Sequence, residues 1–161
     1  MPSKSESEPL VSRVQSAFQQ LSAAATTLNT ASDRLSKLVA ELDSALKTLN
    51  VGLVCWVNID DPSFSEDGQE EYSEQVGYAK INGKWGIAVR TVNDVAWAQH
   101  VGVEEWAFSD APRHLRLKAI DLIPALLDEL AKEASENTKK ITEKTEEVQQ
   151  LVTAIKGGVR R

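Results

Sequence analysis

The chain has 161 residues, enough for one domain with a hydrophobic core, and a formal net charge of −6. Residues 1–50 are neutral, residues 51–110 carry −8 and residues 111–161 carry +2. An acidic middle argues against general binding to nucleic acid. A single cysteine, Cys55, excludes an internal disulfide and a four-thiolate metal site, so we expect a reducing, cytoplasmic compartment. No apolar run is long enough to predict a signal peptide or a membrane span.

A long helix is predicted over residues 9–50, after a disordered start at residues 1–8, with Pro9 tolerated in the first turn. Apolar residues recur every three or four positions from Val11, taken here as heptad position a, and residues 10–49 contain neither Gly nor Pro. The a and d positions, called the seam below, are Val11, Val14, Phe18, Leu21, Ala25, Leu28, Ser32, Leu35, Val39, Leu42, Leu46 and Leu49.

The two flanks of this seam differ in chemistry. A two-stranded coiled coil usually carries charged residues at e and g, whereas a small apolar flank is typical of a helical bundle. The helix can end at Asn50 or Gly52, because both residue types tolerate a left-handed backbone. The g positions are Ala17, Ala24, Ala31, Leu38 and Ala45, and the e positions are Gln15, Ser22, Asn29, Ser36 and Asp43.

Residues 51–110 are predicted to form a small antiparallel sheet of three to four strands. Val51–Ile59 is a candidate buried strand, and the acidic stretch 60–75 is a candidate solvated loop. Residues 93–103 have no strand pattern, and a further strand is expected over residues 104–109 because apolar and polar residues alternate there.

The clearest local signal is Asn82-Gly83 between two strand-like runs, which predicts a two-residue type I′ turn. This turn sets a register that pairs Tyr78 with Ile87 and Val76 with Val89. One face of the hairpin is then large and apolar, and it carries Val76, Tyr78, Trp85, Ile87 and Val89. The other face is almost bare, with Gly77, Ala79, Gly86 and Ala88, and allows close approach by a helix, a sheet or a flat ligand.

A second long helix is predicted over residues 111–156, with Ser109 and Asp110 as caps and Pro112 in the first turn. Pro124 should kink or break it, and Gly157-Gly158 should stop it before a disordered tail, residues 157–161. Because a compact sheet returns the chain near its starting point, the two long helices should run antiparallel. The predicted fold class is therefore α+β, a helical hairpin of two heptad-patterned helices joined by an antiparallel sheet.

Two polar clusters are candidate sites. Ser63, Ser65, Asp67 and Glu74 match a calcium-loop spacing weakly, and a solvated loop is the favoured interpretation. Cations at a helix N-terminus oppose the helix dipole and call for a negative partner. This partner is either the chain's own acidic residues or an anionic ligand. The cations concerned are Arg113, His114, Arg116 and Lys118.

Aromatic residues offer one further candidate. Trp85, Trp97, His100 and Trp106 could line a ligand pocket, although tryptophans are also what a small sheet needs to build its core. No spacing matches a catalytic or metal-binding motif, so neither a catalytic residue nor a metal or other cofactor is predicted.

These patterns favour a non-enzymatic interaction or oligomerisation protein. The predicted interaction surface on the first helix is formed by Val14, Phe18, Leu21, Ala24 and Leu28. Leaving such residues in water is costly, so a homodimer through the long helices, or docking on a helical protein partner, is expected. The alternatives are a small-ligand sensor with an aromatic pocket in the sheet, and an enzyme whose site has no recognisable motif.

Overall fold

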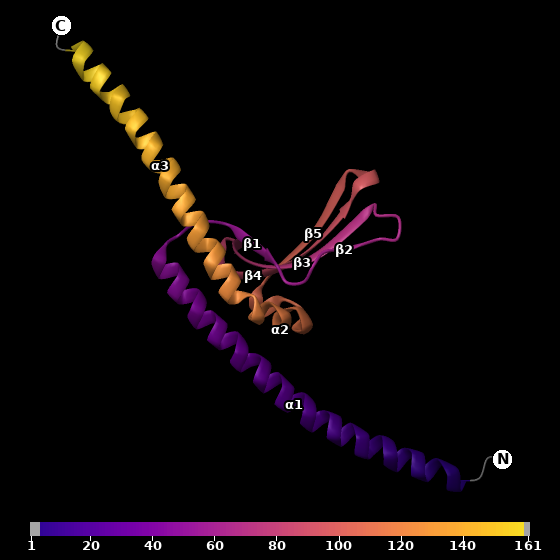
Figure 1. Cartoon of the computed structure of the whole chain (residues 1–161). Coiled ribbons are helices and arrows are strands. Elements are labelled where there is room, and N and C mark those ends of the chain that lie inside the picture. The colour runs from indigo at the N-terminus through magenta and orange to yellow at the C-terminus, as the bar shows by residue number, and fades with distance from the viewer. Residues whose placement is uncertain (1–3, 160–161) are drawn as a thin grey trace. The chain divides into compact units, whose positions relative to one another are not determined.

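The computed structural model describes residues 4–159 and divides into two compact units, Met1–Leu42 and Asp43–Arg161. The first unit is the greater part of helix α1 (Lys4–Leu49), and the second holds the last two turns of α1, the whole sheet and the remaining helices. The fold is α+β (Figure 1).

Helix α1 is continuous over 46 residues. It begins at Lys4 rather than at residue 9, so residues 4–8 are helical and were wrongly predicted to be disordered; residues 1–3 lie outside the described residues. Because α1 begins at Lys4, Pro9 is its sixth residue and lies inside the helix rather than in the first turn, where it was predicted. Both expected stop positions have a left-handed backbone, with φ of 51° at Asn50 and 61° at Gly52.

Five antiparallel strands form one sheet in the order β1-β3-β4-β5, with β2 paired to β3 outside this path. Their bounds are β1 (Cys55–Asn58), β2 (Ser63–Phe64), β3 (Glu70–Ile81), β4 (Lys84–Val95) and β5 (His100–Ala107). The register predicted from Asn82-Gly83 is confirmed, with Tyr78 opposite Ile87 and Val76 opposite Val89. Asn82 and Gly83 have φ of 49° and 81°, as a type I′ turn requires.

Three strand boundaries differ from the sequence prediction. The strand predicted over residues 51–59 is confined to Cys55–Asn58. The acidic stretch 60–75 is not one loop, because β3 already begins at Glu70. Residues 93–103 are largely strand, interrupted only by the short helix η1 (Ala96–Ala98). In residues 70–75 and 93–103 the strands continue past the apolar part of the hairpin. They do so because their backbones pair with neighbouring strands, not because their residue types favour strands.

The C-terminal part is helical and breaks where Pro124 predicted, giving α2 (Arg113–Asp121) and α3 (Ile123–Val159). Ser109 and Asp110 do not cap α2; they belong to a short helix, η2 (Phe108–Asp110), and Pro112 is the N-cap residue. Gly157 and Gly158 do not stop α3, which runs to Val159. A glycine inside a helix costs only about 1 kcal/mol, so two glycines shift an exposed helix end rather than fix it.

The core lies between one face of the sheet and helices α2 and α3 (Figure 1). Val76, Ile87 and Val89 on that face are at most 1% exposed, and Leu115 of α2 and Leu126 of α3 are equally buried. The other end of the sheet, with β2, projects away from these helices. Within residues 4–159, none of the helices combines the length and apolar character that a membrane crossing requires.

Candidate interaction surfaces

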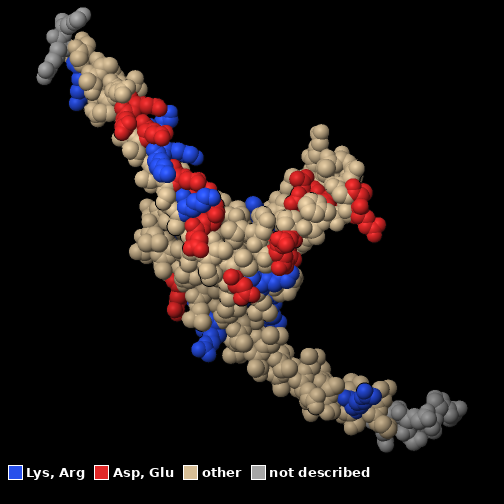
Figure 2. Space-filling view, in the orientation of Figure 1, with Lys and Arg blue, Asp and Glu red and all other residues tan. Residues whose placement is uncertain are grey.

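The first candidate surface is the N-terminal half of the α1 seam. Its large side chains, Val11, Val14, Phe18, Leu21 and Leu28, are between 46 and 69% exposed. Residues 14–32 contain no Asp, Glu, Lys or Arg, and Figure 2 shows an uncharged tan stretch along α1. Ala24, the remaining residue of the predicted surface, lies on the exposed g flank. All five predicted interaction residues therefore belong to one exposed, uncharged length of helix.

Helix α3 carries a second exposed apolar row beyond the sheet, formed by Ile141, Val148, Leu151, Val152 and Ile155. A shallow hollow of about 440 Å³ follows this row between Lys140 and Val152. In contrast to α1, this helix is densely charged over residues 128–147, where acidic and basic residues alternate (Figure 2). Charge of both signs suits a solvated helix face.

The bare face of the hairpin is filled by two side chains of the same unit. A Cβ added to Gly77 would collide with the ring of Trp56, and one added to Gly86 would lie 3.0 Å from a carboxylate oxygen of Asp43. The close approach predicted for this face therefore takes place, and the groups that approach are an indole ring and a carboxylate. Asp43 Oδ1 accepts a hydrogen bond from the Ile87 backbone N–H.

Beside Trp56, one polar residue from each of four strands forms a row across the sheet. Gln75 donates to Asn58 at 2.8 Å and accepts from Arg90 Nε at 2.6 Å. Arg90 lies 3.7 Å from Glu105, and its guanidinium stacks 4.1 Å from the centroid of the Trp56 ring. Each pair in the row is also a pair in the strand register, so these contacts fasten the sheet together.

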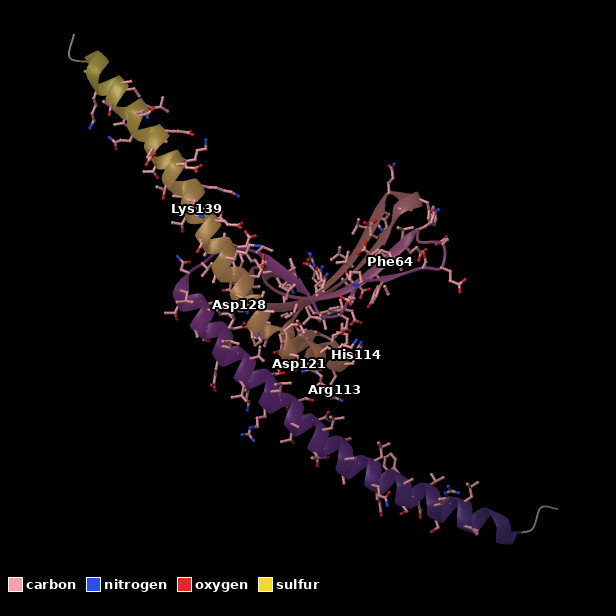
Figure 3. All side chains as sticks on the ribbon, viewed as in Figure 1. Phe64, Arg113, His114, Asp121, Asp128 and Lys139 are labelled. Carbon is pink, nitrogen blue, oxygen red and sulfur yellow. The ribbon has the colours of Figure 1, made fainter. Side chains whose placement is uncertain are left out.

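The four candidate anion-binding residues lie on α2, where Figure 3 shows Arg113 and His114. Lys118 donates to Glu74 at 2.9 Å and to Asp60 at 3.0 Å, and these hydrogen bonds raise the pKa of its amine. For Lys118, the internal acidic partner expected as one alternative is therefore present. Arg113 and Arg116 are also engaged in interactions.

His114 contributes to a different feature, an open hollow of about 590 Å³ between the sheet and the start of α2. Tyr72 and Trp106 also line it, together with Glu104. Burial raises the pKa of the Tyr72 hydroxyl, and the carboxylates of Glu74 and Glu104 raise it further. Glu104 is the one carboxylate among the residues that line this hollow, and His114 is the one basic residue.

The structure separates the four residues of the predicted aromatic pocket. Trp85 stacks on Tyr78 with ring centroids 5.5 Å apart, at the turn end of β4. Trp97 and His100 are exposed at the opposite end of that twelve-residue strand. Trp106 alone among the four lines the hollow described above.

Sequence reasoning missed Tyr72 and Glu104, because Tyr72 lies in the stretch interpreted as a loop. Extending the hairpin register outward would have placed Tyr72 in the sheet opposite Asn93, whereas Glu104 is paired with Thr91 through the separate register of β4 and β5. It also missed Phe64, which is 65% exposed on the projecting end of the sheet (Figure 3).

The weak calcium-loop match finds no support in the geometry. Asp67 accepts hydrogen bonds from Ser65 and from the Gln69 backbone, which lower its pKa, and Glu74 is bound to Lys118. Among the described residues, no three His, Cys, Asp or Glu side chains are grouped so that they could hold a metal ion. Comparison of the chain with models of protein families, with curated proteins and with solved structures finds no match.

Proposed function

We propose that this protein is an interaction module that associates with itself through its long helices. The observation that carries the proposal is the exposed seam of α1, which presents Phe18, Leu21 and Leu28 to solvent within the uncharged stretch 14–32 of that helix. Burying each such side chain contributes about 1.5 to 3 kcal/mol, so covering the row strongly favours association. Contiguous exposed apolar surface of this kind is typical of a protein interface.

The predicted helical hairpin belongs to the same proposal. In a homodimeric bundle, the apolar rows of α1 and α3 would be covered together, since α3 carries its own exposed row at Ile141, Val148 and Ile155. A bundle of four helices, two from each copy, would bury the apolar rows of α1 and α3 at once. The head formed by the sheet then remains free to present its acidic surface.

Sedimentation of the full chain over a concentration series tests this proposal. We expect the wild-type chain to associate at concentrations on the order of micromolar. The double variant Phe18→Gln/Leu21→Gln should be monomeric at the same concentrations, because it removes the centre of the seam. The matched control is Ser16→Gln/Ala23→Gln, which places the same residue type on the outer f positions and should associate like the wild type. A wild-type chain that stays monomeric at roughly 100 μM overturns the proposal.

A second candidate function is the binding of a small ligand in the hollow lined by Tyr72, Trp106 and His114. Its aromatic side chains favour an aromatic compound. This proposal can be tested by titrating the protein with indole or tryptamine and following the NMR chemical shifts of its tryptophan indole N–H groups. Trp106→Leu is the variant expected to lose binding. Shifts that persist in Trp106→Leu, or that are absent in the wild type, would exclude this hollow as the binding site.

A further inference from the structure

The g and e positions that flank the α1 seam differ in chemistry, and this difference bears on the direction of a partner helix. Leu10 precedes the first heptad at a g position, so the g flank within the first unit is Leu10, Ala17, Ala24, Ala31 and Leu38. Leu10 and Leu38 are 62% and 53% exposed. The e flank on the other side is polar but uncharged from Gln15 to Asn29. One flank is thus apolar and the other is able to form hydrogen bonds.

The direction of a partner helix decides which flanks meet. In a parallel pair related by two-fold symmetry, each g flank faces the e flank of the other copy. In an antiparallel pair the symmetry brings g to g and e to e, because the two-fold axis then crosses the helices. A parallel pair of α1 would set alanine and leucine against glutamine and serine. An antiparallel pair sets apolar against apolar and polar against polar.

The apolar flank also fixes a register, because it is symmetric about Ala24. Leu10 and Leu38 are equally far from Ala24, and so are Ala17 and Ala31. With Ala24 beside its own copy, leucine meets leucine and alanine meets alanine along the whole flank. On the polar side, the same register sets Ser22 beside Ser22 and Gln15 beside Asn29.

The seam fits the same register. Each a position then lies opposite a d position, which pairs Phe18 with Leu28, Leu21 with Ala25 and Val14 with Ser32. Leu21 and Val14 each meet a smaller side chain, which favours even packing, and Phe18 meets Leu28. A parallel pair in register would instead stack Phe18 on Phe18 and Ala25 on Ala25. That arrangement alternates crowded and empty layers, and both are destabilising.

Charge and area agree with this arrangement. The uncharged stretch, residues 14–32, maps onto itself, so like charges oppose each other nowhere within it. At either end Arg13 of one copy lies level with Asp33 of the other, but at the outer positions c and b these side chains do not meet across the seam, so they do not oppose this register. The exposed fractions of the five large seam residues correspond to roughly 500 Å² per copy. Covering all of this surface in two copies would bury about 1,000 Å², the lower bound for a specific interface.

We infer that the exposed seam of α1 binds a second copy of itself, antiparallel, with the two-fold axis level with Ala23 and the two copies of Ala24 side by side on the apolar flank. This inference rests on the self-association proposed above and adds the direction and register of the helices. The small alanine side chains on the g flank let the two backbones approach closely at Ala17, Ala24 and Ala31, as small residues do at tight helix contacts.

Cysteine cross-linking of the full chain tests the inference, in a Cys55→Ala background that leaves each variant one thiol. Ala24→Cys should form a disulfide-linked dimer readily, because the two thiols face each other across the axis. Ala17→Cys is the matched control on the same flank. Its two thiols lie roughly 18 Å apart along the helix axis, so its cross-linking should be at least about tenfold slower. Mixing Ala17→Cys with Ala31→Cys should restore rapid cross-linking.

The outcomes separate the inference from the proposal on which it rests. If the chain associates but Ala17→Cys and Ala24→Cys cross-link equally well, the helices are parallel, and the antiparallel register is wrong while self-association stands. If sedimentation shows a monomer, both fall. Association with rapid cross-linking of Ala24→Cys alone, restored for Ala17→Cys by the Ala31→Cys partner, supports both.

Discussion

Asp43 Oδ1 accepts a hydrogen bond from the backbone N–H of Ile87, with 2.7 Å between oxygen and nitrogen. The pairing of β4 with β5 ends at Ala88, and Ile87 is the neighbouring residue of β4 that has no partner in β5. The carboxylate therefore satisfies a donor that the sheet leaves open on a residue only 1% exposed. In this way Asp43, two turns before the end of α1, is fixed to the edge of β4.

Removing this acceptor should destabilise the protein. Asp43→Ala leaves the Ile87 N–H unsatisfied, which should lower the free energy of unfolding by about 1 to 3 kcal/mol. Asp43→Asn is the matched control, because its amide oxygen can still accept the bond, and it should lose much less. Urea unfolding at neutral pH measures both variants. Equal losses for the two would show that the hydrogen bond is not what the carboxylate contributes.

The same residue should make stability depend on pH. Burial raises the pKa of Asp43 above its usual value of 3.8, outweighing the opposing effects of the Ile87 hydrogen bond and of Lys47. The folded state thus binds this proton more tightly than the unfolded state, so the contribution of Asp43 is greatest below pH 3.8 and is lost as pH rises through the folded-state pKa. The stability of the wild type relative to Asp43→Asn should therefore increase on acidification. A difference that stays constant between neutral pH and pH 4 would contradict this expectation.

Gly77 should tolerate no side chain. A Cβ there would collide with the Trp56 ring and the Cys55 carbonyl, so Gly77→Ala should cost about 1 to 3 kcal/mol of stability. Gly102 provides the control within the same sheet, because its nearest neighbour to an added Cβ is the Asn93 carbonyl at 3.8 Å. Gly102→Ala should be neutral within roughly 0.5 kcal/mol, as measured by thermal and urea unfolding. Similar losses at both positions would point to a general intolerance of alanine.

Arg90 should not be replaceable by lysine. Its planar guanidinium stacks on Trp56 and binds Gln75 at the same time, and an ammonium group cannot do both. Arg90→Lys keeps the charge but should lower the free energy of unfolding by roughly 1 kcal/mol. If Arg90→Lys unfolds at the same urea concentration as the wild type, the stacked geometry contributes nothing to stability.

The two carboxylates that hold Lys118 should differ in importance. The Glu74 side chain is 14% exposed and that of Asp60 is 62% exposed. Asp60→Asn should change stability by less than about 0.5 kcal/mol, as is usual for an exposed ion pair. Glu74→Gln should cost about 1 to 2 kcal/mol, because it also weakens the contact with the Tyr72 hydroxyl. The reverse order in urea unfolding would assign the main interaction to Asp60.

Local patterns in the sequence were sufficient wherever the determining residues are close together. Asn82-Gly83 specified the hairpin and its register, and Pro124 specified the break between α2 and α3. The strands of acidic or small residues were missed, because Glu70 and His100 enter the sheet through pairing with β4 and not through their own preference for strands.

Contacts between residues far apart in the chain could not be predicted from the sequence patterns. Asp43 was an ordinary polar e position in the heptads, and nothing near it in the chain indicates Ile87 as its partner. The separation of Trp85 from Trp97 likewise follows from the length of β4, which extends into the residues predicted to have no strand pattern. The candidate interaction residues on α1, in contrast, share one helix face because a single period of the sequence places them there.

The simple order of the strands has a consequence for folding. Each of β3, β4 and β5 pairs with the strand before it, and only the two-residue β2 intervenes between β1 and β3. Such local pairing folds quickly, because little chain must be ordered to close each contact. The Asp43 contact instead joins residues separated by 44 positions. We therefore expect the sheet to form before the last two turns of α1 join it, although these turns precede every strand in the chain.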